Sequence, residues 1–153
     1  MRRPILRLVL DTNVWLDWLV FDDPGIVPIR NAVGTGRVEL YVDAVCEAEL
    51  VEVLARGFAK RTLDGAAQAA CIAQCRRLAK RIDAAAPAAE RAALPACKDP
   101  DDQKFLEAAL AAGAQFLVTK DRALLELGKR RSRLPFQILA PGDFRAAYQG
   151  GLL

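Results

Sequence analysis

Residues 98–121 read KDPDDQKFLEAALAAGAQFLVTKD, and this stretch decides the fold. Asp99, followed by proline, predicts a helix start, because aspartate accepts hydrogen bonds at an N-cap and proline loses nothing at the first helical position. Apolar residues follow Asp102 at the third, fourth and seventh positions. That spacing places Asp102 at the head of the buried stripe of the helix.

The same stretch continues into a predicted strand. Gly113 is expected to end the helix, because glycine adopts the left-handed conformation at little cost. The apolar run 115–119 then has the length and composition of an interior strand. Asp121 comes just after the carboxyl end of that strand. The stretch is therefore an αβ unit with carboxylates at both ends.

The composition indicates a soluble globular protein. The chain has 153 residues, of which 53% are hydrophobic and 27% are charged. We expect one domain over residues 1–153. No apolar run approaches the roughly 18 residues of a membrane span, and the short apolar N-terminus soon meets Asp11, so we expect a cytoplasmic protein.

Histidine is absent from the sequence. This absence excludes histidine-based triads, histidine general bases and histidine-containing zinc sites. The four cysteines form no C-x-x-C pair, and we expect them to be reduced. The net charge of +3 is small, and the basic clusters at 76–77, 80–81 and 129–133 are explained equally well as solvated surfaces.

Strand and helix patterns alternate along the whole chain. The expected strands are 5–10, 38–42, 115–119 and 136–139; the expected helices are 14–21, 26–32, 44–56, 64–83, 122–127 and 141–148 in addition to the one that starts at Asp99, with a basic turn at 128–133. This alternation predicts an α/β fold with a mostly parallel sheet and helices on both faces.

Four acidic residues are placed where such a fold builds its sites. Asp11 and Asp121 follow strands, and Glu49 and Asp102 come from helices that must pack on the sheet. Converging carboxylates without basic neighbours repel one another, and a divalent metal ion is the usual remedy. Ligation by oxygen alone suits Mg²⁺ or Mn²⁺ better than zinc.

Each acid also has a purely structural explanation. Asp11 and Asp121 could cap the helices that follow them, and Asp102 could interact with its helix dipole. Glu49 lies beside apolar positions and could pair with a lysine or arginine, whereas Glu47 is expected to project towards the rim of the apolar stripe or outside it. If each acid had only a structural role, four separate coincidences would be needed to place them all beside one another. A common site explains the four placements at once.

The ordered motifs resemble the PIN-domain family, in its bacterial branch of toxins from toxin–antitoxin pairs. The resemblance rests on LVLDTN at 8–13, ELVEVL at 49–54, DPDDQKFLEAA at 99–109, VTKD at 118–121 and ILAPGDF at 138–144. It covers nearly the whole chain in the family's order. Residues 56–96 have no match at the level of single residues.

The resemblance implies a three-layer α/β/α sandwich and a ribonuclease that depends on Mg²⁺ or Mn²⁺. The residues that match the family's catalytic and metal-binding acids are Asp11, Glu49, Asp102 and Asp121. Those that match supporting positions are Asn13, Thr119 and Asp99. The implied reaction is hydrolysis of an RNA phosphodiester by a metal-activated water.

Partners follow from the same resemblance. The basic residues expected to hold single-stranded or structured RNA are Lys120, Arg122, Lys129, Arg130 and Arg131. An antitoxin protein and a homodimer are also implied. Trp15 and Trp18 are expected to be core or interface anchors, and together with Phe21 they could form the dimer face.

Two other functions fit the same residues. The main alternative is a non-catalytic PIN-fold module that binds RNA or protein. The other is a carboxylate–Mg²⁺ phosphatase of a different α/β fold. Such enzymes place a second aspartate two residues after the first, where this chain has Asn13.

Overall fold

A single parallel sheet forms the centre of the computed structural model, which describes residues 4–58, 61–130 and 134–149. The five strands are ordered β3-β2-β1-β4-β5, and every neighbouring pair is parallel. They are β1 (Leu6–Leu10), β2 (Val38–Val42), β3 (Ala79–Arg81), β4 (Phe116–Val118) and β5 (Gln137–Leu139).

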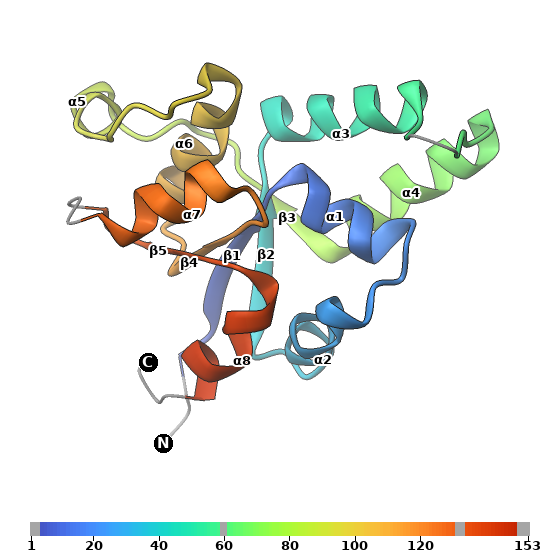
Figure 1. The fold of residues 1–153 in the computed structure, drawn as a ribbon, viewed down its shortest axis with the longest axis horizontal. Helices are drawn as coiled ribbons and strands as arrows, with labels where there is room; N and C mark the ends of the chain where they lie inside the picture. The colour runs from blue at the N-terminus through green and yellow to red at the C-terminus, as the bar shows by residue number, and fades with distance from the viewer. Residues whose placement is uncertain (1–3, 59–60, 131–133, 150–153) are drawn as a thin grey trace.

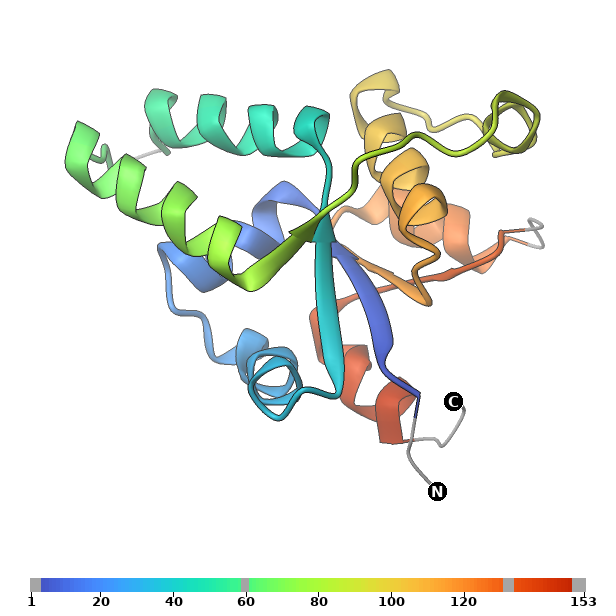
Figure 2. The same cartoon turned by 180° about the vertical axis from the view of Figure 1, so that it is seen from behind.

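Helices cover both faces of this sheet (Figures 1 and 2). Helices α6 and α7 lie on one face; α1, α2, α4, α8 and most of α3 lie on the other. The helices are α1 (Thr12–Leu19), α2 (Val27–Gly34), α3 (Ala44–Arg56), α4 (Gly65–Leu78), α5 (Ala88–Ala92), α6 (Gln103–Ala112), α7 (Arg122–Lys129) and α8 (Pro141–Gln149), with short 3-10 turns η1 (Pro24–Ile26) and η2 (Pro100–Asp102). The predicted α/β/α sandwich is confirmed.

The two central strands supply apolar side chains to both layers. Leu8 and Leu10 of β1 point into the core beneath α1 and α2, and Val9 points into the core beneath α6. Phe116 and Leu117 of β4 divide in the same way. Burial on both faces explains why β4 is continuously apolar and why β1 is apolar apart from Arg7.

The strand order favours a ligand-binding site at the carboxyl ends of the central strands. After β1 the chain adds β2 and β3 on one side, and it later adds β4 and β5 on the other. The order therefore reverses between β1 and β4. Open α/β sheets bind their ligands outside the carboxyl ends of the strands at such a reversal.

The predicted helix 64–83 is wrong at its end. Helix α4 stops at Leu78, and residues 79–81 form the edge strand β3, paired with β2 from Leu40↔Ala79 to Val42↔Arg81. Lys80 also forms an ion pair with Glu39 of β2 at 2.6 Å. These cross-strand bonds outweigh the helix propensity of the alanine-rich sequence.

The outward placement predicted for Glu47 is also wrong. Glu47 is 6% exposed and forms ion pairs with Arg76 at 2.8 Å and Arg81 at 3.1 Å. The hydrogen bond from Arg76 is the main cause that lowers the pKa of the Glu47 carboxyl. Glu47 therefore joins α3 to α4 and β3.

The proposed dimer face contains residues that a partner could not reach. Trp15 and Trp18 are 3% and 7% exposed and belong to the core, with ring centroids 6.2 Å apart. Only Phe21 is exposed, and it packs edge-on against Phe58. Trp15 and Trp18 are therefore core residues and not part of a dimer face, which is the first of the two expectations for them; the homodimer itself stays a prediction.

Three smaller observations complete the fold. The predicted basic turn begins later than expected, because Gly128 and Lys129 belong to α7 and residues 131–133 lie outside the described part. All four cysteines are free thiols, as predicted. Within the described ranges, no helix has the length and apolar character needed to cross a bilayer.

Candidate active site

Two of the four acids follow the two central strands. Asp11 comes directly after β1, Asp121 follows β4 after Thr119 and Lys120, and each caps the helix that starts there. The Asp11 carboxylate accepts a hydrogen bond from the Val14 amide at 3.1 Å, and the Asp121 carboxylate accepts one from the Leu124 amide at 2.9 Å. The capping explanation is therefore correct for both residues, and it brings both to the strand-order reversal.

A buried threonine links these two acids. Thr119 is fully buried, and its hydroxyl donates to the Asp11 carboxylate while accepting from the Asp121 backbone N–H at 2.9 Å. Asp11 is only 4% exposed. Burial raises the pKa of the Asp11 carboxyl, and the Thr119 hydrogen bond opposes that rise.

Glu49 approaches from α3 and is held at both oxygens. The Thr12 hydroxyl donates to one of them, and the Lys104 ammonium lies 2.6 Å from the other. Both members of the Glu49–Lys104 ion pair are mostly shielded from solvent, with side chains 27% and 20% exposed. Glu49 therefore has the basic partner that a carboxylate beside a core requires.

Asp102 differs from the other three acids. It lies in the turn η2 at the start of α6, half-buried, and its side chain makes no capping bond. Desolvation raises the pKa of Asp102 to about 6, aided by repulsion from Asp121, Asp99, Asp11 and Glu49. The other three predicted acids are thus near enough to act electrostatically on Asp102.

The donor chemistry of this group suits a hard divalent cation. All the ligand atoms offered are carboxylate or hydroxyl oxygens, which Mg²⁺ and Mn²⁺ prefer. Among the described residues, no three acidic or thiol side chains already enclose a space for a metal ion. Asp11 is drawn toward Thr119 and Glu49 toward Lys104, so side-chain rotation would have to complete the coordination.

A family model described as "PIN domain" matches residues 7–123, a range that includes all four acids. The chain belongs to the PIN-domain family. A solved structure with a similar fold is that of VapBC2 from Rickettsia felis bound to a DNA fragment from their promoter. The match has a TM-score of 0.57 at 12% identity and covers 88% of this chain and 98% of that chain. No curated protein sequence matches the chain.

Not all of the predicted supporting residues of this PIN domain contact the four acids. Thr119 contacts two of them, as described above. Asn13 is exposed on α1 and forms no hydrogen bond to Asp11 within the described part. Asp99 caps η2 by accepting from the Asp101 amide at 2.9 Å, and its charge contributes to the raised pKa of Asp102.

Sequence reasoning missed Thr12 and Lys104. Thr12 is inside the DTN motif at 11–13, in which only Asp11 and Asn13 match residues with a known role. Lys104 directly precedes the buried Phe105 on α6, and a lysine at the border of an apolar stripe can bury its stem and present its ammonium to a neighbouring element. The expectation that Glu49 needs a lysine or arginine was the available signal.

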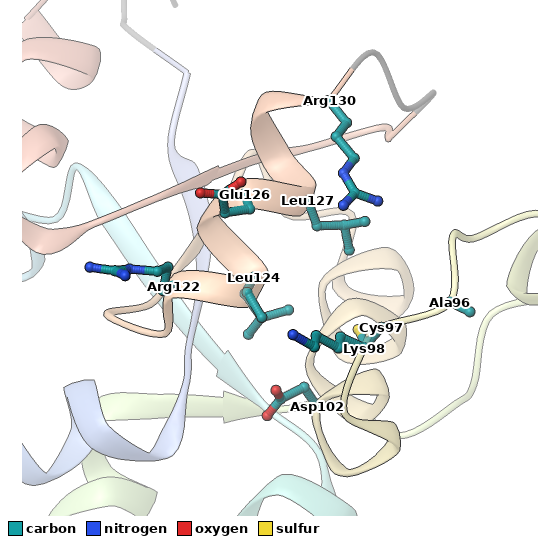
Figure 3. A pocket seen from close by; sticks show the side chains of 10 residues that line it. Ala96, Cys97, Lys98, Asp102, Arg122, Leu124, Glu126, Leu127 and Arg130 are labelled. Atoms are coloured by element: carbon teal, nitrogen blue, oxygen red, sulfur yellow. The ribbon is translucent and has the colours of Figure 1, made fainter.

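The basic residues predicted to hold RNA fall into separate places. Lys120 forms an ion pair with the buried Asp17 at 2.7 Å. Lys129 is exposed at the end of α7. Arg122 and Arg130 line a cavity of about 560 Å³ beside Asp102 (Figure 3). Arg131 lies outside the described residues.

Proposed function

We propose that this PIN domain is a ribonuclease that depends on Mg²⁺ or Mn²⁺ and acts as the toxin of a type II toxin–antitoxin pair. The observation that carries the proposal is Asp102. This half-buried carboxylate has no hydrogen bond or ion pair among the described residues, and three other site acids repel it. Such a placement destabilises a folded protein unless a cation neutralises it, so function is the reason to keep it.

Asp11, Asp102 and Asp121 would hold the metal, with Glu49 either as a ligand or through a bound water. When bound, the ion would activate a water for attack on a phosphodiester and stabilise the charge that develops on the phosphate. Oxygen donors alone supply this set, in agreement with a hard cation.

The other residues orient these acids. One Thr119 hydroxyl bonds both to Asp11 and to the backbone of Asp121, so it fixes two acids from neighbouring strands. Lys104 holds one Glu49 oxygen and Thr12 holds the other. A site built on a rigid sheet edge and supported by such bonds keeps its carboxylates in place while a substrate binds.

RNA cleavage tests the enzymatic part of this proposal. A labelled single-stranded RNA is incubated with the purified protein in Mg²⁺, Mn²⁺ or EDTA, together with the variants Asp102→Asn and Asp101→Asn. Asp101 is the matched control, since it carries the same charge one residue away but is exposed. We expect metal-dependent cleavage by wild type and Asp101→Asn, and at least a hundredfold loss in Asp102→Asn.

Growth after induced expression tests the toxin part. Wild type should arrest growth of a bacterial host, and Asp102→Asn should not, at equal protein levels. The fold shared with the VapBC2 structure supports this part of the proposal but does not extend beyond the fold at 12% identity. Harmless expression of an active nuclease would contradict the toxin role alone.

A binding module is the second candidate. The ion pair between Lys104 and Glu49 favours it, because that ammonium already occupies one site carboxylate without any metal. If no metal supports cleavage and Asp102→Asn binds RNA as well as wild type does, this candidate replaces the nuclease.

A further inference from the structure

The cavity beside Asp102 lies between α7 and the segment that leads into η2 (Figure 3). Its volume of about 560 Å³ falls within the range of small-molecule sites, roughly 300–1,000 Å³. The four site acids do not account for the cavity, since Asp102 alone among them contributes to its lining. Asp102 therefore belongs both to the carboxylate group and to this cavity.

One wall of the cavity is apolar. Leu124 and Leu127 of α7 are 2% and 8% exposed and form this wall together with Ala123. Cys97 borders the cavity from the other side (Figure 3). Apolar walls of this kind hold the faces of nucleobases that have left a stack.

The remaining lining carries more positive than negative charge. Lys98 and Arg130 contribute cations and Asp102 a carboxylate, while the charged ends of Arg122 and Glu126 point away from these three in Figure 3. In Figure 3 the Lys98 side chain reaches between Asp102 and Leu124. Lys98 forms no ion pair within the described ranges, so its ammonium can meet a phosphate. A cation beside an apolar wall matches the phosphate and base of one nucleotide.

We infer that this cavity is the subsite for one nucleotide of the RNA strand, adjacent to the phosphate at the carboxylate group. The inference rests on the proposed ribonuclease function. The base lies against Leu124 and Leu127, and its phosphate meets Lys98. Asp102 borders both regions, so a strand with its scissile phosphate at the acids has its neighbouring nucleotide over this cavity.

Methyl NMR of the leucine side chains in EDTA tests base binding without any catalysis. The probes are the four nucleoside 5′-monophosphates, the free nucleosides and inorganic phosphate. We expect at least one nucleotide to shift the Leu124 and Leu127 methyl signals and to bind at least tenfold more tightly than phosphate. Equal affinity for phosphate, or no shift of these two methyls, would overturn the inference and leave the cavity for a segment of a protein partner.

The salt dependence of RNA binding tests the phosphate contact. For single strands, the slope of log affinity against log salt falls by about 0.7 for each lost phosphate contact. Lys98→Gln should reduce the slope by about that amount in EDTA. Arg77→Gln, an exposed cation on α4 on the other face of the sheet, is the matched control and should leave the slope unchanged. An unchanged slope in Lys98→Gln would refute the contact.

The two proposals fail in different ways. If RNA is cleaved with metal while the leucine methyls stay silent and Lys98→Gln behaves as wild type, the subsite is wrong and the nuclease stands. If nucleotides bind in the cavity but no metal supports cleavage, the subsite stands on a binding module.

Discussion

Asp102→Asn should make the metal-free protein more stable at neutral pH. The carboxylate is half-buried, and desolvation, followed by repulsion from four other carboxylates, raises its pKa from 3.8 to about 6. A shift of that size corresponds to about 3 kcal/mol at 1.36 kcal/mol per pKa unit. Solvent screening of this partly exposed group reduces the expected gain to about 1–2 kcal/mol. Asparagine keeps the shape and removes the charge.

The direction of the pKa shift fixes how the stability difference between Asp102→Asn and wild type depends on pH. The folded pKa of Asp102 lies above the unfolded value, so the folded state takes up its proton first as the pH falls. Well above pH 6 the group is ionised in both states, and wild type carries the full destabilisation. Near pH 4 and below, that destabilisation disappears. The advantage of Asp102→Asn should therefore be largest at pH 7.5 and shrink to nothing near pH 4.

Urea unfolding in EDTA from pH 4 to pH 8 measures this difference. Asp101→Asn is the control, because it removes an exposed charge from the same turn. Saturating Mg²⁺ should reverse the order by stabilising wild type, by about 2.7 kcal/mol at a hundred times the dissociation constant. An Asp102→Asn variant that is no more stable than wild type at pH 7.5, or whose advantage does not depend on pH, would refute the reasoning.

Three further perturbations test other features. Lys104→Met should lower the free energy of unfolding by about 1–2 kcal/mol in EDTA, since Glu49 loses a half-buried partner. The same variant should bind Mn²⁺ more tightly, as measured by calorimetry, because the ammonium no longer competes with the metal for Glu49. Glu47→Gln should lower the free energy of unfolding by about 2 kcal/mol at pH 7, because Glu47 is buried beside two arginines. The difference between variant and wild type should vanish as the pH falls through the lowered pKa of Glu47. Urea titrations at pH 7 and pH 3 would measure it. Gly113→Ala should lower the thermal midpoint through a loss of about 1 kcal/mol, because the φ of 63° at this helix end disfavours a side chain.

Local sequence signals predicted the elements that build the site. Asp99 starts the turn that leads into α6, Gly113 ends the helix in the left-handed conformation, and β4 follows directly. Each of these rests on residues within one helical turn of one another. Asp43, which caps α3 by accepting from the Cys46 amide at 2.8 Å, is another local contact of this kind.

The failures share a different cause. The sequence of β3 favours a helix locally, and only pairing with β2, far earlier in the chain, makes it a strand. Glu47 and Glu49 lie two residues apart on the flanks of one helix, and the arginines that bury Glu47 come from α4 and β3. Lys104 meets Glu49 across a separation of 55 residues. These partnerships depend on the tertiary packing, which helical periodicity does not describe.

Helix capping has a consequence for how such a domain would decay if its chemistry were no longer selected. Asp11 and Asp121 each hold a helix start, so losing either one destabilises the protein as well as its site. The Asp102 side chain caps no helix and is repelled by neighbouring carboxylates, so a substitution that removes its charge stabilises the fold. In a lineage no longer selected for catalysis, Asp102 would be the first of the four acids to be lost, and the two capping aspartates would be the last. An intact Asp102 is therefore a better sign of continuing selection for catalysis than either capping aspartate.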